Sequence, residues 1–387
     1  MPRHIPYGKQ EISDNDIDEV IKVLKSDFIT QGPKIDVFES NISNYVGSKY
    51  SCAVNSATSA LHISCLALGV GAGDYVWTSP NSFVASSNCA LYCGANIDFV
   101  DIDPITNNIS LDCLERKLKE AEKKDALPKV VIPVHLSGLS CDMKSIYDLS
   151  NQYKFKIIED ASHAIGAEYK NKKVGSCEYS DISVFSFHPV KIITTGEGGL
   201  ACTNNKNIAK KLNILRSHGV TRDRDFMENE PHGDWYYEQL DLGLNYRITD
   251  IQAALGISQL KRLDQFIQKR NKLAKIYDAE LNSEFYDLPQ VGGDQVSSFH
   301  LYIIKLKEEL KSNHRKLFSH LRSNGIGVNI HYIPIHYHPY YKKLGFRKGD
   351  FPNAENYYQR AISIPLYFGL SKSDQKYVID EMNRFFE

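Results

Sequence analysis

A predicted strand leads directly into a lysine in the segment Val184-Phe-Ser-Phe-His-Pro-Val-Lys191-Ile-Ile-Thr-Thr-Gly-Glu-Gly-Gly199. The run before it is largely apolar on successive residues, which is typical of a strand covered on both faces. Burial lowers the pKa of an amine, so a lysine held between such a strand and an apolar pair can attack an aldehyde as the free base. The alternative is a solvated lysine at a strand end, which by position alone is the commoner case.

Short apolar runs alternate with helix-like segments on both sides of this stretch, which is typical of an α/β fold. Strands are expected at residues 75–78, 97–100, 129–134, 156–158, 182–187 and 199–203. Helices are expected at residues 57–68, 82–93, 111–121, 143–153 and 206–215. Because open sheets of this type bind ligands at the carboxyl ends of their strands, the residues just after each strand are the candidate site residues.

The second part of the chain has a different pattern. Residues 249–281 carry apolar side chains at helical spacing, which predicts one long helix that joins two domains. The remainder is typical of a small α+β unit, with expected elements at residues 301–305 (strand), 314–324 (helix), 327–331 (strand) and 373–386 (helix). We therefore expect a large α/β domain with a mostly parallel sheet over residues 1–250. A smaller α+β domain that includes the joining helix is expected over residues 251–387.

The composition limits the possible functions. A chain of 387 residues that is 42% hydrophobic can bury a large core. With 46 Lys and Arg against 47 Asp and Glu, the formal net charge of −1 gives no overall field for nucleic acid or an anionic membrane. No run approaches the about 20 apolar residues of a membrane span, and the eight cysteines form no Cys-x-x-Cys pair. We expect a cytoplasmic protein that binds neither nucleic acid nor a membrane.

A carboxylate follows another predicted strand, in Ile157-Ile-Glu-Asp160-Ala-Ser-His163. A carboxylate at such a strand end can pair with a pyridinium nitrogen and keep it protonated, which makes the ring an electron sink. His163 could hydrogen-bond a phenolic oxygen of the same ring. The alternatives are that Asp160 caps the next helix and that His163 is an ordinary buried histidine.

Two further strand ends carry residues suited to a flat, phosphorylated ligand. In Asn55-Ser-Ala-Thr58-Ser, small hydroxyl residues stand where a helix begins, and the N–H groups of a helix start bind phosphate. Phe83 follows the strand at 75–78 and could stack on a flat ring. Taken alone, the first segment fits an ordinary helix cap better than a phosphate site, and Phe83 is as easily a core residue. One cofactor could explain all four features together: the phosphate site, the stacking ring, the carboxylate and the lysine.

These motifs and several others resemble a known family. They are Gln31-Gly-Pro, Asn55-Ser-Ala-Thr-Ser-Ala-Leu-His, Glu159-Asp-Ala-Ser-His-Ala, Ser186-Phe-His-Pro-Val-Lys and Gly243-Leu-Asn-Tyr-Arg-Ile-Thr-Asp250. Over nearly the whole chain the sequence is similar to the DegT/DnrJ/EryC1/StrS family of fold-type I pyridoxal-phosphate enzymes, which are aminotransferases of nucleotide-linked keto sugars. Motifs that resemble the branch of pseudaminic acid biosynthesis are Pro6-Tyr-Gly-Lys-Gln, Trp77-Thr-Ser-Pro and His331-Tyr-Ile-Pro-Ile-His.

The resemblance implies a role for each matching position. Lys191 would form the Schiff base with pyridoxal phosphate and carry the proton during transfer. The other implied cofactor contacts are Asp160 at the ring nitrogen, His163 near the phenolic oxygen, Phe83 on the ring face, and the Ala57 backbone, Thr58 and Ser186 at the phosphate. Asn245 would reach that phosphate from the neighbouring subunit, so the enzyme would be a homodimer with shared active sites. The implied substrate contacts are Tyr7, His331 and Tyr332.

The resemblance also implies a reaction. Glutamate would give its amino group to the cofactor, which would pass it to the C4 ketone of a UDP-linked 2-acetamido-2,6-dideoxy hexose. The alternatives are a different nucleotide-linked 3- or 4-keto sugar and a non-catalytic regulatory protein on the same fold. Some members carry a histidine in place of the lysine and remove a hydroxyl group instead, and Lys191 argues against that reaction here.

Two groups of residues remain to be placed. Arg216 and Arg247 are candidates for binding the carboxylate of the amino donor. His331, His336 and His338 form a cluster without an acidic or cysteine partner nearby in the sequence, and the prolines around them indicate a shaped loop. We therefore expect no metal.

Overall fold

The computed structural model of the chain describes residues 4–386. Its central sheet has seven strands, in the spatial order β1 (Tyr50–Val54), β9 (Gly199–Thr203), β8 (Ile182–Ser186), β5 (Lys156–Asp160), β4 (Val130–Ile132), β2 (Tyr75–Thr78) and β3 (Asn96–Phe99). The strands from β8 to β3 pair in parallel, whereas β9 runs antiparallel to both of its neighbours. This confirms the predicted α/β fold with a mostly parallel sheet.

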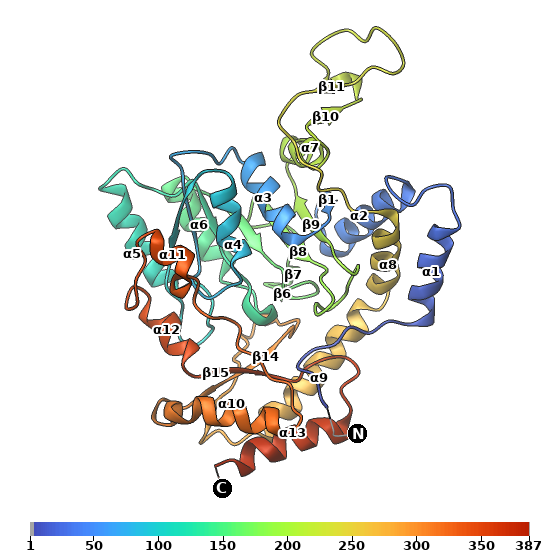
Figure 1. Cartoon of the computed structure of the whole chain (residues 1–387). Coiled ribbons are helices and arrows are strands. Elements are labelled where there is room, and N and C mark those ends of the chain that lie inside the picture. The colour runs from blue at the N-terminus through green and yellow to red at the C-terminus, as the bar shows by residue number, and fades with distance from the viewer. Residues whose placement is uncertain (1–3, 387) are drawn as a thin grey trace.

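Helices cover both faces of this sheet (Figure 1). One face packs against α3 (Ala57–Ala67), α4 (Ala85–Tyr92) and α7 (Lys206–Leu215). The other packs against α5 (Leu111–Glu122) and α6 (Met143–Tyr153) at one end, and against α2 (Pro33–Val46) and α8 (Asp250–Leu260) at the other. Successive side chains of β5 pack on opposite faces of the sheet, since Ile157 and Ile158 belong to different apolar clusters. Double coverage explains why these strands are apolar on successive residues.

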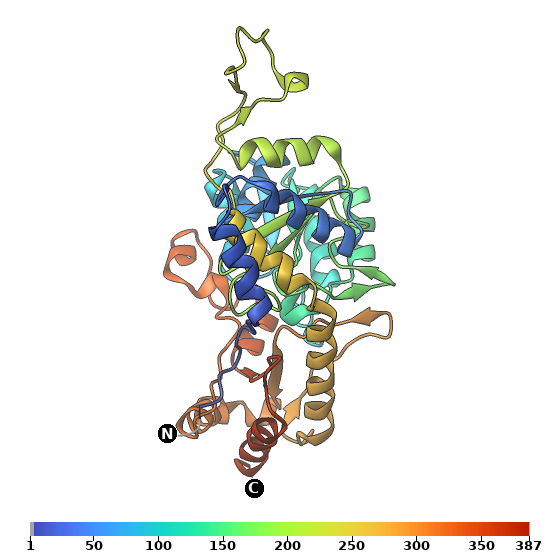
Figure 2. The same ribbon diagram turned by 90° about the vertical axis from the view of Figure 1, so that its right-hand side faces the viewer.

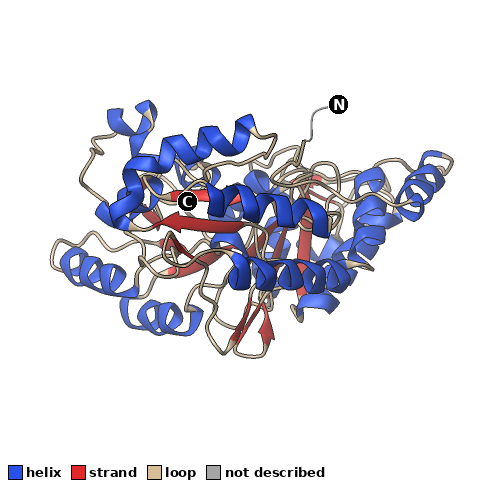
Figure 3. Cartoon of the chain, turned by 90° about the horizontal axis from the view of Figure 1, so that it is seen from below, coloured by secondary structure: helices blue, strands red, loops and turns tan. Residues whose placement is uncertain are grey.

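A second, smaller sheet lies toward the carboxyl terminus. Its strands are β12 (Tyr286–Asp287), β14 (Tyr302–Leu306) and β15 (Ala361–Ile364), all antiparallel. The helices that pack with it are α9 (Leu263–Glu280), α10 (His314–Ser323) and α13 (Lys372–Arg384). Figure 3 views this end of the molecule, with helices in blue and strands in red. The division of the chain at residue 250 stays a prediction.

The described part of the chain has further helices and strands outside these two groups. They are α1 (Asp14–Leu24), β6 (Glu168–Tyr169), β7 (Lys172–Lys173), β10 (Val220–Thr221), β11 (Glu238–Gln239), β13 (Gln295–Val296), α11 (Pro339–Lys343) and α12 (Pro352–Tyr358). No helix within residues 4–386 is both long enough and apolar enough to cross a membrane.

The single long helix predicted over residues 249–281 is wrong. The chain forms α8 and α9 instead, with a break at Lys261 and Arg262. Arg262 leaves helical geometry, and its guanidinium binds the buried carboxylate of Asp16 on α1 at 2.5 Å. Helix α8 thus packs beside α1 (Figure 2), whereas α9 turns toward the small sheet. The apolar spacing continues through the break, so the sequence pattern gives no sign of it.

The strand predicted at residues 327–331 is also wrong, although this segment is hydrogen-bonded. The N–H of Gly327 donates to the carbonyl of Ile5 at 2.7 Å, and Asn329 exchanges bonds with Ser363 on β15. The hydrogen-bonding partner of this segment changes from Ile5 to Ser363 within two residues, so the segment does not pair with one strand over its length. Strands β1 and β15 were not predicted. They are short, and β1 carries small residues (Cys52 and Ala53) where a bulky β-branched run would have indicated a strand.

A hairpin formed by β10, β11 and the chain between them stands clear of the body in both side views (Figures 1 and 2). We call residues 217–245 the arm. Exposed apolar side chains lie at both ends of the arm, with Trp235 at 73% exposure between β10 and β11 and Leu242 at 82% near the base. Large exposed apolar side chains are typical of a surface that meets another protein.

Candidate active site

A cavity of about 920 Å³ opens where β5 and β8 end and α3 begins. Most of the predicted site residues line it: Tyr7, Ala57, Thr58, Phe83, Asp160, His163, Ser186, Lys191, His331 and Tyr332. Residues up to 325 positions apart thus meet in one place, from Tyr7 to Tyr332. Their individual roles stay predictions.

Lys191 stands in a tight turn that follows β8, where its N–H donates to the carbonyl of His188 at 2.9 Å. The apolar residues after it, Ile192 and Ile193, are buried in the core and anchor the turn. Burial lowers the pKa of the Lys191 amine to about 8, against the opposing pull of the Asp160 carboxylate. An amine with this pKa supplies free base near neutral pH, as a nucleophile toward an aldehyde requires.

Asp160 ends β5 and is only 5% exposed. Its Oδ2 accepts a hydrogen bond from the Ser86 hydroxyl at 2.6 Å, and its Oδ1 accepts one from the Ser162 N–H at 3.1 Å. Ser86 is itself fixed by Ser82, whose hydroxyl lies 2.7 Å away. The carboxylate is therefore held rigidly by neutral donors on the cavity wall. A carboxylate in this setting is suited to pairing with a protonated ring nitrogen.

His163 is buried beside the same wall. Its Nδ1 accepts a hydrogen bond from the Ser137 N–H at 3.3 Å, and its Nε2 lies 3.1 Å from the Tyr332 hydroxyl. Burial, with Lys191 and His331 nearby, holds the pKa of His163 well below its usual value. The ring is therefore neutral, and because Nδ1 accepts, Nε2 carries the proton. His163 thus carries a single N–H, at Nε2, which donates to the Tyr332 hydroxyl oxygen beside the cavity.

The start of α3 provides a site for an anion. Ser56 caps the helix by accepting from the Ser59 N–H at 3.1 Å, while the N–H groups of Ala57 and Thr58 have no acceptor within the helix. Helix α3 begins against β9, and a Cβ added to Gly199 would overlap the peptide between Ser56 and Ala57. The close approach explains the glycine of the motif after Lys191. It also fixes the helix start beside the lysine.

Aromatic side chains form the mouth of the cavity. Phe83 is 58% exposed and its ring lies 6.2 Å from that of Tyr332, so one face is open to a flat ligand. The rings of Tyr7 and His331 lie 5.4 Å apart. Burial lowers the pKa of His331 to about 4, so this ring is neutral and its Nδ1 bonds the Ser363 hydroxyl at 2.8 Å. The three predicted substrate contacts share this mouth.

Three predicted residues lie outside the cavity of this chain. Asn245 belongs to the base of the arm and pairs with Ser217. The guanidinium of Arg216 binds the carboxylate of Glu39 and the carbonyl of Ala53, so it is occupied in the core. Arg247 bonds the hydroxyl of Ser217 at 3.2 Å. In the described chain, neither arginine faces the cavity.

Several cavity residues were not singled out from the sequence. They are Asn55, Ser162, His188, Glu197, Gln252 and Asn329. Gln252 caps α8 and donates to the carbonyl of Glu197 at 2.8 Å, which joins the glycine-rich turn to that helix. Thr249 and Gln252 form a capping box, a pattern that predicts where the helix starts. Nothing in this pattern indicates that Gln252 lines a cavity.

The histidine cluster does not converge on one point. His331 bonds Ser363, and His336 lies 3.0 Å from a carboxylate oxygen of Glu355. Among residues 4–386, no three His, Cys, Asp or Glu side chains are grouped so that they could hold a metal ion.

The residues of the cavity fit pyridoxal phosphate. An amine of lowered pKa, a rigid buried carboxylate, a helix start for the phosphate and an open aromatic face occupy one space. Each corresponds to one group of the cofactor: the aldehyde, the ring nitrogen, the phosphate and the ring face.

Comparison with known proteins supports the same assignment. The model of the DegT/DnrJ/EryC1/StrS aminotransferase family matches residues 10–383. A Campylobacter jejuni protein named UDP-4-amino-4,6-dideoxy-N-acetyl-beta-L-altrosamine transaminase is 40% identical over 380 residues, covering 98% of this chain and 96% of its own.

Two solved structures are similar over nearly their full length. Helicobacter pylori PseC, an aminotransferase involved in the biosynthesis of pseudoaminic acid, superposes with a TM-score of 0.90 at 30% identity, covering 99% of both chains. Spr1654 of Streptococcus pneumoniae, described as a sugar aminotransferase, superposes with a TM-score of 0.90 at 30% identity in its PMP-form, covering 98% of both chains. It has also been solved in its PLP-form. The chain therefore belongs to the DegT/DnrJ/EryC1/StrS aminotransferase family, and it is an aminotransferase that uses pyridoxal phosphate.

Proposed function

We propose that the protein transfers an amino group from glutamate to the C4 ketone of a UDP-linked 2-acetamido-2,6-dideoxy-4-keto hexose, in the biosynthesis of pseudaminic acid or a related surface sugar. The observation that carries the proposal is the Lys191 amine of lowered pKa in one cavity with the rigid carboxylate of Asp160. The substrate rests on the similarity to the Campylobacter jejuni transaminase. The enzyme is expected to work in the cytoplasm, where nucleotide-linked sugars are made.

Bound pyridoxal phosphate supplies an aldehyde for amines and a ring that accepts the electron pair released from carbon. We assign Lys191 to its aldehyde carbon, Asp160 to the ring nitrogen, His163 to the phenolic oxygen and Phe83 to the ring face. The phosphate is assigned to Thr58, Ser186 and the N–H groups at Ala57.

Lys191 also moves the proton. Its pKa of about 8 lets it take up and release a proton near neutral pH, which transfer between two carbon positions requires. The Ser86 hydroxyl and the Ser162 N–H donate to the Asp160 carboxylate and hold it in place for pairing with the ring nitrogen. In the described chain the Nε2–H of His163 donates to the Tyr332 hydroxyl oxygen. We assign the phenolic oxygen of the cofactor as the acceptor that takes over this bond.

The charges of the cavity support a homodimer. Lys191 is the only Lys or Arg among the described residues that line it, and Asp160 and Glu197 are acidic. A sugar nucleotide brings a diphosphate, which needs cationic partners. The arm of a second copy carries Arg222 and Arg224 and an exposed apolar end, and Asn245 lies at its base. We therefore place Asn245 of the second copy at the cofactor phosphate and its arm over the nucleotide.

The absorption spectrum of the purified protein tests the two half reactions separately. Added pyridoxal phosphate should produce the visible band of the lysine-bound cofactor. Glutamate should bleach this band, and the UDP-linked 4-keto sugar should restore it. A band that glutamate leaves unchanged would overturn the choice of donor, and the absence of any band would overturn the assignment of Lys191.

A different nucleotide-linked 3- or 4-keto sugar is the alternative substrate. The same bleached protein distinguishes the two, because each candidate sugar is added in turn and the rate of band recovery is measured. Fastest recovery with a sugar other than the UDP-linked 4-keto hexose would replace the proposed substrate and leave the aminotransferase chemistry unchanged.

A further inference from the structure

A chain of hydrogen bonds behind the cavity wall controls which nitrogen of His163 carries the proton. Nδ1 of His163 accepts from the N–H of Ser137, and this contact alone excludes a proton on Nδ1. Ser137 lies in the short 3₁₀ turn Leu136–Gly138, where it adopts a positive φ of 58°. Such a conformation costs about 1 kcal/mol or more for a residue with a side chain. Surrounding contacts must therefore hold the turn in place.

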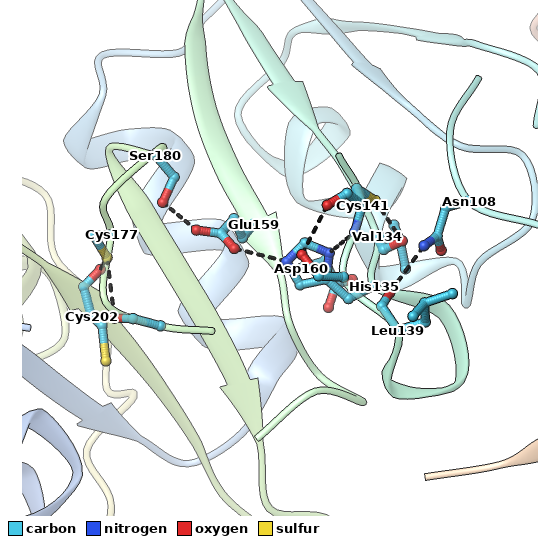
Figure 4. A network of polar contacts seen from close by, with 12 residues as sticks. Asn108, Val134, His135, Leu139, Cys141, Glu159, Asp160, Cys177, Ser180 and Cys202 are labelled. Atoms are coloured by element: carbon cyan, nitrogen blue, oxygen red, sulfur yellow. Dashed lines mark hydrogen bonds and ion pairs between the residues drawn. The ribbon is translucent and has the colours of Figure 1, made fainter. Parts of the chain in front are cut away.

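Asn108 clamps the turn from both sides. This side chain is 3% exposed, and its Oδ1 accepts from the Leu136 N–H at 3.0 Å while its Nδ2 donates to the Leu139 carbonyl at 2.9 Å. The two bonds bracket Ser137 along the chain. Figure 4 shows Asn108 beside Leu139 at this turn.

His135 ties the start and the end of the same loop to β5. Its backbone N–H donates to the carbonyl of Asp160 at 3.1 Å, and its Nδ1 accepts from the Cys141 N–H at 3.1 Å. Its Nε2 bonds the buried carboxylate of Glu159 at 2.7 Å, and Glu159 also accepts from the Ser180 hydroxyl (Figure 4). Burial lowers the pKa of His135, but its contacts with Cys141 and Glu159 outweigh burial and raise this pKa to about 10. The Cys141 N–H nevertheless occupies the Nδ1 lone pair, so the ring shares only its Nε2 proton with Glu159.

Gly138 lets the turn lie against His163. Its φ is +98°, and a Cβ there would lie 2.9 Å from the carbonyl oxygen of His163 and would overlap the Ser298 hydroxyl. Ser298 donates that hydroxyl to the His163 carbonyl at 2.8 Å and its N–H to the Gly138 carbonyl at 3.0 Å. The backbone and the ring of His163 are thus both bonded through this one loop.

We propose that Asn108 and the His135–Glu159 pair are positioning residues that hold His163 in the tautomer with its proton on Nε2. None of the three lines the cavity, so each acts through Ser137. The Nε2–H bonds the Tyr332 hydroxyl oxygen, and both residues line the cavity, so a ligand there would compete for this proton. The catalytic consequence rests on the proposed function, but the tautomer itself is a property of the protein without cofactor.

Nuclear magnetic resonance of protein labelled with ¹⁵N-histidine, without cofactor, measures this directly. The signals of His163 are assigned by their loss in His163→Gln, and their couplings to carbon-bound protons show which nitrogen is protonated. The unchanged protein should show Nε2–H alone, and Asn108→Ala and Glu159→Ala should each show both tautomers. Glu159→Gln keeps an acceptor for His135 and should retain the single tautomer.

Asn383→Ala is the matched control, because the Asn383 side chain likewise accepts from a backbone N–H (Asn282, 3.1 Å) and donates to a carbonyl (Glu280, 2.9 Å), does not line the cavity, and should leave His163 unchanged. Asn108→Asp, which loses only the donor to Leu139, replaces Asn108→Ala if that variant does not fold. A proton on Nδ1 in the unchanged protein, or a single Nε2–H tautomer in folded variants of both Asn108 and Glu159, would overturn the proposal.

A second readout separates this inference from the proposed function. With cofactor and substrates, the variants that mix the tautomers should lose about tenfold in kcat with little change in KM, as the loss of an orienting partner does elsewhere. The variants could show mixed tautomers even if the unchanged protein transfers no amino group between the proposed substrates. That result would support the positioning role and would reject only the proposed function.

Discussion

Gly199 at the start of β9 lies so close to Ala57 at the start of α3 that a side chain on Gly199 would overlap the peptide nitrogen of Ala57. The strand that follows the lysine turn therefore sets the position of the proposed phosphate site. Gly199→Ala should push the two elements apart and weaken pyridoxal phosphate binding at least tenfold, measured by titration of the visible band. Gly71→Ala is the control, since a Cβ there meets no atom within 4 Å.

The pKa of Lys191 predicts how cofactor capture depends on pH. Because burial lowers this pKa to about 8, the free amine increases tenfold per pH unit below 8 and levels off above it. The rate of band formation with pyridoxal phosphate should follow the same curve in stopped-flow measurements. A rate that keeps rising up to the usual lysine pKa would contradict the burial of this amine.

The lowered pKa of Lys191 also predicts how the free energy of unfolding depends on pH. Between pH 8 and the ordinary lysine value of 10.5, the unfolded chain binds more protons at this position than the folded chain, so stability rises with pH across this window. Lys191→Met removes the buried ionisable group. In the absence of cofactor it should raise the Tm relative to the unchanged protein at pH 7, and the difference should shrink toward pH 10. Equal Tm differences at both pH values would show that the effect is unrelated to ionisation.

Substitution of Asp160 should reduce the rate of amino transfer more than substitution of Ser86. Asp160→Asn removes the negative charge opposite the ring nitrogen, so cofactor should still bind while amino transfer falls by about 100-fold or more. Ser86→Ala removes one of two hydrogen bonds to that carboxylate and should cost only about tenfold. The rate of a single turnover with glutamate, measured for each variant, gives both losses. Equal losses in both variants would mean that Ser86 contacts the ligand itself.

Mixed dimers test whether active sites are shared. Lys191→Ala and Asn245→Ala should each be nearly inactive as purified proteins. If Asn245 serves the site of its partner, mixing and refolding the two variants together should restore activity in one of the two sites of each mixed dimer. No recovery, with mixed dimers demonstrated by distinct tags, would place Asn245 and Lys191 in the site of the same chain.

Local patterns made much of the cavity predictable. Lys191 and Asp160 each follow a strand that is buried on both faces, and the carboxyl ends of parallel strands converge wherever the fold forms. The amino acid type and the position after a strand were therefore enough to group them. Ala57 and Thr58 were predictable for a similar reason, because a helix start carries its own polar groups.

Contacts between distant segments were not predictable in this way. Asn108 and Ser137 influence His163 through hydrogen bonds that join three separate loops, and neither residue belongs to a motif with a recognisable spacing. The break at Arg262 depends on Asp16, which lies 246 residues earlier. Tertiary partners of this kind override a regular apolar pattern without leaving a trace in it.

The route of the chain through the cavity has a consequence for biosynthesis. Ile5 and Tyr7 are fixed by bonds to Gly327 and Leu366, at 2.7 and 3.0 Å, so the amino-terminal segment finds its partners only near the end of the chain. The ribosome releases most of the cofactor-binding residues long before His331 and Tyr332. The nascent chain thus carries an open, incomplete pocket until the segments with Gly327 and Leu366 have been made, and Tyr7 can settle only after them.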